Sequence, residues 1–119
     1  MVAGARPRVL LVEDNREIRE ALAEILEAEG YAITAVDSAE HGLDELGRER
    51  FDLVVSDYGL PGHTGAWMLG QAVLAGRLDE GHALLVTAHP EPNSRGFKVM
   101  AKPLDFDRFL GELAGMLQA

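Results

Sequence analysis

Five residues spread along the chain have side chains that together could bind a cation and handle a phosphoryl group: Glu13, Asp14, Asp57, Thr87 and Lys102. Carboxylates that converge on one point repel one another unless a cation lies between them, and such oxygen ligands suit Mg²⁺. A carboxylate beside a divalent ion can also act as a nucleophile toward phosphorus. The ammonium and hydroxyl groups would then stabilise charge on the phosphoryl oxygens. If the five residues meet, they predict formation of an aspartyl phosphate.

Each of these residues also has an ordinary structural explanation. Asp14 could cap a helix, Asp57 could open a turn, and Lys102 could simply be solvated. Taken singly, the structural explanation is the stronger one for each residue. The chemical interpretation therefore depends on whether the fold brings all five to one place.

Short apolar runs rich in branched residues predict the strands that would position these side chains. Each of the five residues ends or follows one of these runs, which lie at 8–12, 32–36, 51–56, 83–87 and, more weakly, 97–101. Apolar residues at helical spacing lie between them, and a last helix is expected from about Asp105. Its predicted apolar stripe consists of Phe106, Phe109, Leu110, Leu113 and Leu117.

Strands that alternate with helices predict an α/β fold with a doubly wound parallel sheet. In such sheets, ligands bind at the carboxyl ends of the strands. The five candidate residues all lie at predicted carboxyl ends, so we expect one site along that edge.

Composition narrows the possible functions further. A length of 119 residues predicts a single domain, 1–119, with a flexible N-terminus at 1–7. The formal charge of −9, of which −8 lies in residues 1–60, argues against direct binding to DNA or to anionic membranes. The absence of cysteine excludes disulfides and cysteine-ligated metals. No apolar run approaches the length of a membrane span, so we expect a cytoplasmic protein.

Four motifs add a family resemblance: VLLVEDN at 9–15, DLVVSDYGLPGHTG at 52–65, VTA at 86–88 and AKP at 101–103. In order and spacing they resemble the receiver domains of bacterial two-component response regulators, of the single-domain chemotaxis type. The resemblance covers essentially the whole chain. It implies a flavodoxin-like fold with strand order 2-1-3-4-5.

The resemblance also implies a mechanism and partners. Asp57 would accept a phosphoryl group from a phosphohistidine of a sensor histidine kinase or a histidine phosphotransfer protein. The chain would then signal to an unknown downstream protein by conformational change or by binding. It would catalyse only its own phosphorylation and dephosphorylation, and so would not be an enzyme in the usual sense.

Individual site residues take the following roles by the same resemblance. Asp14 would bind Mg²⁺ directly and Glu13 mainly through water, and Asp57 with the backbone carbonyl of Gly59 would complete the protein ligands. Thr87 and Lys102 would contact the phosphoryl oxygens. The Lys102–Pro103 peptide is expected to be cis, a form that is inexpensive only before proline.

The segment between the fourth and fifth predicted strands departs from the family pattern. Only Ala88–Gly96 is available for this crossover, and Pro90 and Pro92 lie within it. Proline removes a backbone donor and disfavours helix in the residue before it. We therefore expect the fourth helix to be shortened or absent, and two or more helical turns within 88–96 would contradict this.

Other departures concern output and phosphate lifetime. Receivers usually have an aromatic switch residue three positions before the lysine, but here that position is Val99, whose expected role is packing. Phe97 is a possible substitute, with an ordinary core role as the alternative. Gly59 and His89 occupy positions near the path of the attacking water in the family. We expect Gly59 to leave this path open and His89 to cover or orient it, although His89 could equally be a plain loop residue.

Two other functions remain open at this stage. A receiver-like interaction module that never uses phosphate is favoured by Val99 and the short crossover, but disfavoured by the complete five-residue site. A small metal-dependent phosphohydrolase is less favoured, because short loops after each strand offer little substrate pocket. An excised receiver of a hybrid kinase would have the same sequence features as a stand-alone regulator.

Overall fold

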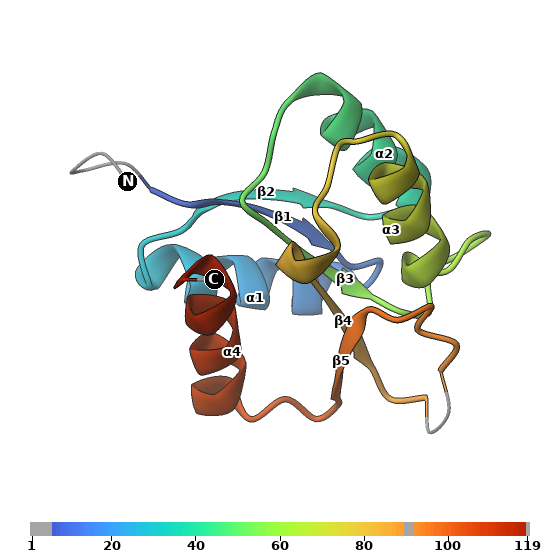
Figure 1. The fold of residues 1–119 in the computed structure, drawn as a ribbon. Coiled ribbons are helices and arrows are strands. Elements are labelled where there is room, and N and C mark those ends of the chain that lie inside the picture. Colours follow the sequence, from blue (N-terminus) through green and yellow to red (C-terminus); the bar gives the residue numbers. More distant parts are fainter. Residues whose placement is uncertain (1–5, 90–91, 119) are drawn as a thin grey trace.

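The computed structural model describes residues 6–89 and 92–118 and has a five-stranded parallel sheet at its centre (Figure 1). The strand order is β2-β1-β3-β4-β5, and each neighbouring pair is parallel. The predicted α/β fold class is confirmed. The strands are β1 (Arg8–Val12), β2 (Ala32–Val36), β3 (Leu53–Asp57), β4 (Ala83–Thr87) and β5 (Lys98–Ala101).

Four helices connect or follow the strands, and side-chain caps define where they begin. Asn15, Ser38 and Thr64 each accept a hydrogen bond from the backbone N–H three residues later, which satisfies a free donor of the first helical turn. Asp105 does the same for the last helix. The helices are α1 (Arg16–Ala28), α2 (Ala39–Arg48), α3 (Gly65–Leu74) and α4 (Phe106–Gln118), with a short 3-10 turn, η1 (Glu80–His82), before β4.

The helices form two layers around the sheet. Helices α1 and α4 cover one face, and α2 and α3 cover the other (Figure 1). Successive β1 residues alternate between the two cores: Val9 and Leu11 pack with α1 and α4, whereas Leu10 and Val12 pack with α2 and α3. This alternation explains the continuous apolarity of the strand, because both faces are buried.

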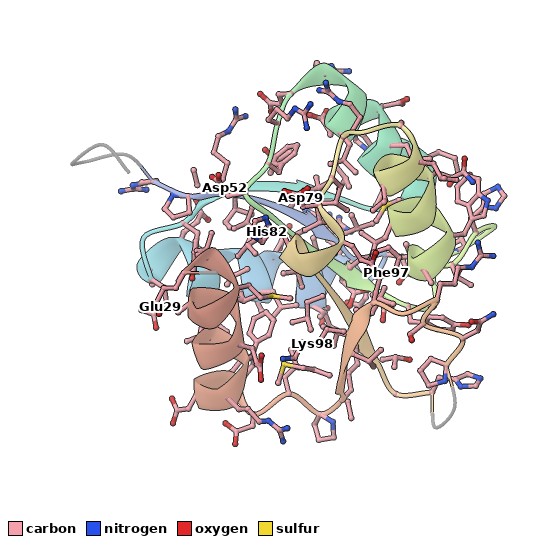
Figure 2. The ribbon with its side chains drawn as sticks, viewed as in Figure 1. Glu29, Asp52, Asp79, His82, Phe97 and Lys98 are labelled. Carbon is pink, nitrogen blue, oxygen red and sulfur yellow. The ribbon has the colours of Figure 1, made fainter. Side chains whose placement is uncertain are left out.

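The crossover from β4 to β5 has no helix in its described residues, 88–89 and 92–97. The predicted loss of the fourth helix is confirmed for these residues, whereas Pro90 and Glu91 lie outside the described part. Arg95 and Gly96 both have positive φ, of 54° and 88°, and turn the chain into β5. The side chain of Phe97 is only 6% exposed and packs into the core beneath α2 and α3 (Figure 2). Phe97 therefore has the core role that was the alternative to a switch.

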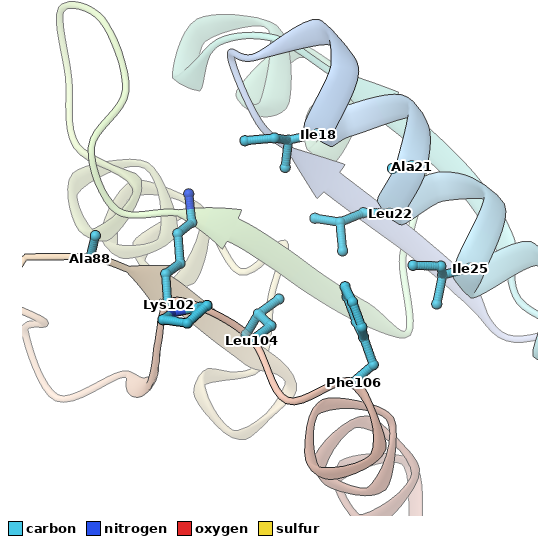
Figure 3. Close-up of a pocket in the computed structure, with 9 residues that line it drawn as sticks. Ile18, Ala21, Leu22, Ile25, Ala88, Lys102, Leu104 and Phe106 are labelled. Carbon is cyan, nitrogen blue, oxygen red and sulfur yellow. The ribbon is translucent and has the colours of Figure 1, made fainter.

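One expectation for the last helix is wrong. Phe106 does not join the buried stripe of α4, because its side chain is 46% exposed. Helical side chains lean toward the N-terminus, and Phe106 is the first residue of α4, so its ring points toward α1 (Figure 3). The other four residues of the predicted stripe do pack against the core: Phe109 and Leu113 are buried, and Leu110 and Leu117 are partly buried. Met116, which the stripe did not include, is buried beside them.

Two further sequence expectations concern the chain's N-terminus and the membrane. Most of the expected flexible segment, 1–7, lies outside the described residues, and the carbonyl of Pro7 accepts a hydrogen bond from the Ala32 N–H at 2.9 Å. Among the described residues, no helix is both long and apolar enough to cross a membrane.

Candidate functional site

The acidic residues identified in the sequence meet at the carboxyl ends of the central strands. One carboxylate oxygen from each of Glu13, Asp14 and Asp57 lies within 4.8 Å of the others, which makes this the one such acidic cluster in the described chain. The Lys102 ammonium lies 3.2 Å from an oxygen of Asp57 and 3.4 Å from an oxygen of Glu13. Because these four residues meet, one shared functional role explains them better than four separate structural roles do.

Burial and charge determine how the site ionises. Burial raises the pKa of Asp57, and the nearby Asp14 carboxylate adds to this, against the opposing effect of Lys102. Burial likewise raises the pKa of Glu13. For Lys102, burial lowers the pKa, but the charges of Asp57 and Glu13 outweigh it, so the pKa is raised overall. The ammonium stays charged, whereas the carboxylates are held in an environment that disfavours their charge.

These shifts predict a stability that depends on pH and on Mg²⁺. Because the folded state binds protons to Glu13 and Asp57 more readily than the unfolded chain does, the metal-free free energy of unfolding should fall as pH rises from about 4, the ordinary carboxyl range. Mg²⁺ at about 100 times its Kd should raise the free energy of unfolding by about 2.7 kcal/mol near pH 7. At pH 4 its effect should be much smaller, because protonated carboxyls do not bind it. Urea unfolding with and without Mg²⁺ measures the pH effect and the Mg²⁺ effect. Equal stabilisation by Mg²⁺ at pH 4 and pH 7 would contradict the prediction.

The backbone around the acidic pair is fixed by residues that the sequence analysis did not identify. The Arg19 guanidinium donates to the carbonyl of Glu13 at 2.8 Å and, more weakly, to that of Asp14. The Asn15 N–H donates to the Glu13 carboxylate at 3.2 Å. Nothing in the sequence marks Arg19 for this role, because its reach over the end of β1 depends on how α1 packs.

The start of α3 lies directly against the backbone of the phosphoryl-acceptor candidate. The Ser56 hydroxyl donates to the Asp57 carbonyl at 2.9 Å, and the Gly65 N–H donates to the Tyr58 carbonyl at 2.8 Å. A Cβ atom on Gly65 would collide with the Asp57 carbonyl oxygen and lie 2.6 Å from the Ser56 hydroxyl. Glycine at position 65 is therefore required by this close approach.

The remaining predicted site residues lie along the same edge. Thr87 is buried at the end of β4, and its hydroxyl accepts a hydrogen bond from the His89 N–H at 2.9 Å. Gly59 is exposed after β3, where a Cβ atom would meet nothing within 4 Å. The Lys102–Pro103 peptide is cis, which confirms that expectation.

Comparison with known proteins gives the family of this chain. A family model for the response regulator receiver domain matches residues 9–110. The chain belongs to this family. Over 82 residues, this receiver domain is 46% identical to the response regulator protein FleR of Pseudomonas aeruginosa, covering 69% of the present chain and 17% of FleR. It is 31% identical over 90 residues to the rice two-component response regulator ORR11, covering 75% of this chain and 61% of that protein.

Solved structures give the same assignment. A CheY-like receiver domain protein from Methanospirillum hungatei superposes with a TM-score of 0.86 at 25% identity, covering 96% of this chain and 95% of that one. The response regulator TrrA from Thermotoga maritima, solved in complex with Mg²⁺ and BeF, has a TM-score of 0.82 at 27% identity, covering 92% and 98%. The receiver spans less than two thirds of its first curated relatives, which are longer response regulators. Its function is that of a receiver domain in two-component signalling.

Proposed function

We propose that Asp57 is the phosphoryl acceptor. A carboxylate oxygen of Asp57 forms a bond to phosphorus as the phosphorus–nitrogen bond of a phosphohistidine breaks. The electron pair of that bond stays on the imidazole, which takes up a proton. The observation that carries the proposal is the Lys102 ammonium, 3.2 Å from Asp57, beside three clustered carboxylates. Asp57 and Lys102, with a water molecule as the attacking group, would account for the later loss of phosphate.

The acidic residues fit a magnesium ion. Their oxygens are the donors that Mg²⁺ prefers, and they lie close enough together to need a cation. Glu13, Asp14 and Asp57 would hold the ion together with the Gly59 carbonyl. When bound, Mg²⁺ supplies positive charge that offsets the charge of the phosphoryl oxygens.

Lys102 and Thr87 complete the proposed mechanism. Lys102 can donate to a phosphoryl oxygen while it remains near Asp57, and its raised pKa keeps it cationic. The Thr87 hydroxyl, at the end of the neighbouring strand, has one proton to donate to another phosphoryl oxygen. The receiver would therefore catalyse only its own phosphorylation and dephosphorylation. We also propose that it acts in the cytoplasm, together with its phosphodonor.

Mass spectrometry after incubation with Mg²⁺ and phosphoramidate tests the proposal. We expect one phosphoryl group per chain, on Asp57, that forms only with Mg²⁺. Absence of this product would favour a receiver-like interaction module that does not use phosphate. Rapid hydrolysis of phosphate esters, without a covalent product, would favour the phosphohydrolase.

An apolar groove beside the site suits the phosphodonor protein. A cavity of about 540 Å³ lies between α1 and the segment that joins β5 to α4, with Ile18, Ile25, Leu104 and Phe106 among its lining residues (Figure 3). Lys102 lies at one end of this groove and extends along the end of β3. We propose that a sensor histidine kinase or a histidine phosphotransfer protein docks here, because the groove leads from exposed apolar surface to the acceptor. The receiver then acts on an unknown downstream protein rather than on DNA, which its net charge of −9 would repel.

Ile18→Glu should separate docking from chemistry. Ile18 is 41% exposed at the groove, so a charge there should lower the rate of phosphotransfer from a phosphorylated histidine phosphotransfer protein by about tenfold. Phosphorylation by phosphoramidate should not change, because the acceptor site is intact. The control is Leu74→Glu, since Leu74 is 84% exposed at the end of α3, outside the groove. Equal phosphotransfer rates for the two variants would contradict docking at this groove.

Gly59 and His89 should set the lifetime of the aspartyl phosphate. A Cβ atom at position 59 would meet nothing within 4 Å. An asparagine side chain there would obstruct the attacking water, so Gly59→Asn should slow phosphate loss. His89→Ala should accelerate it about threefold, a change of the size expected for one modest contact. Phosphate release after removal of the phosphodonor measures both rates. Indistinguishable rates in wild type and both variants would count against the two roles.

A further inference from the structure

Tyr58 occupies a position between the acceptor site and the helix-free crossover. It directly follows Asp57, and two backbone bonds fix it: its N–H donates to the Val86 carbonyl at 2.9 Å, and its carbonyl accepts from Gly65 at 2.8 Å. Its side chain is half-buried and packs against the core beneath α2 and α3. These two bonds join the main chain of Tyr58 to β4 and to the start of α3.

The Tyr58 side chain contacts the crossover on both sides of 90–91. The Asn93 N–H donates to the Tyr58 hydroxyl at 3.2 Å. The ring of His89 lies 5.9 Å from the Tyr58 ring, centre to centre, and is inclined to it by 58°. A third contact comes from Thr87, whose hydroxyl accepts from the His89 N–H. Residues of the acceptor edge therefore hold this segment at two separated points.

Side-chain anchors matter here because the crossover has little regular backbone bonding. Among its described residues, 88–89 and 92–97, one internal backbone bond runs from the Phe97 N–H to the Ser94 carbonyl at 3.0 Å. A helix of the same length would fix itself by its own hydrogen bonds. Segments with few internal bonds open locally at low free-energy cost.

We propose that Tyr58 is a positioning residue that holds the crossover, and with it His89, beside the phosphorylated Asp57. This inference rests on the proposed function of Asp57. A hydroxyl has one proton and two lone pairs, so Thr87 can donate to a phosphoryl oxygen and still accept from the His89 N–H. Tyr58 retains the crossover through Asn93 and through its contact with the His89 ring, and loss of the Tyr58 hydroxyl exposes the phosphoryl group to water.

A double-mutant cycle in the full chain tests whether Tyr58 acts through His89. We expect Tyr58→Phe to accelerate phosphate loss about twofold to threefold, the effect of one hydrogen bond. The variant with both Tyr58→Phe and His89→Ala should lose phosphate no faster than His89→Ala alone. The control is Tyr31→Phe, since Tyr31 is buried against α1 and α4 on the other face and should leave the rate unchanged.

Amide hydrogen exchange tests the anchor without phosphorylation. The Asn93 amide should exchange faster in Tyr58→Phe than in wild type, whereas amides of β1 should not change. Unaltered Asn93 exchange, or Tyr58 and His89 effects on phosphate loss that simply add, would overturn the inference while the proposed function stands. A wild-type receiver that takes up no phosphoryl group would remove the proposed function and this inference with it.

Discussion

Asp57→Asn is expected to abolish the phosphoryl product while raising the stability of the metal-free protein. The amide offers no carboxylate oxygen to bond with phosphorus, and Lys102 and Thr87 cannot replace it as acceptors. The substitution also removes a carboxylate that burial and Asp14 hold in an unfavourable charged state. The free energy of unfolding should rise by on the order of 1 kcal/mol without Mg²⁺.

Two measurements on the same variant check this pair of effects. Mass spectrometry with Mg²⁺ and phosphoramidate should find no product, and urea unfolding should find higher stability with a weaker response to Mg²⁺. Asp44→Asn is a matched control, because Asp44 is exposed on α2, away from the acidic cluster. A stable phosphoryl product in Asp57→Asn would assign the acceptor to another residue.

Gly65→Ala is expected to destabilise the fold by about 3 kcal/mol or more, the range reached when a buried group is forced into its neighbours. The added methyl group would collide with the Asp57 carbonyl, which belongs to β3 and cannot move freely. If the variant folds, α3 must shift away, and phosphorylation should slow because the acceptor's backbone moves with it.

Gly70→Ala provides the comparison within the same helix. A Cβ atom at Gly70 would only approach the Arg95 guanidinium, at 4.0 Å, so the methyl group has room. Alanine should stabilise helix α3 there by about 0.5–1 kcal/mol, because glycine costs more backbone entropy. Chemical denaturation of both variants measures the contrast, and similar stabilities would show that the approach at Gly65 is not tight.

Much of the fold and site could be predicted because local patterns determine them. Buried parallel strands are marked by runs of branched apolar residues, and a parallel sheet places their carboxyl ends along one edge. Asp57 and Lys102 were therefore predicted to meet although 45 positions separate them, and their 3.2 Å contact agrees.

The contacts that could not be predicted depend on reach and packing. Arg19 and Tyr58 act through side chains that cross from one element to another, and no periodicity encodes such a crossing. Helical spacing likewise predicted Phe106 in the buried stripe, but its ring is 46% exposed at the start of α4. Packing density decides these cases, and it is a property of the assembled molecule.

Packing also decides whether Phe97 can replace the aromatic switch residue that is missing at Val99. Val99 is half-buried against the core beneath α2 and α3, and Phe97 is buried in that core. Rotation of Phe97 would open a cavity, which is costly in a close-packed interior. We therefore expect the output of this receiver to depend on the crossover rather than on rotation of the Phe97 ring.

The helix-free crossover also gives this receiver a practical use. Exposed, turn-rich segments tolerate inserted sequence better than regular elements do, and residues 95 and 96 form such a turn. This turn is connected through Asn93 and Tyr58 to the strand that carries Asp57. If Asp57 is phosphorylated as we propose, we expect a fluorophore inserted at this turn to change its emission when the phosphoryl group is added.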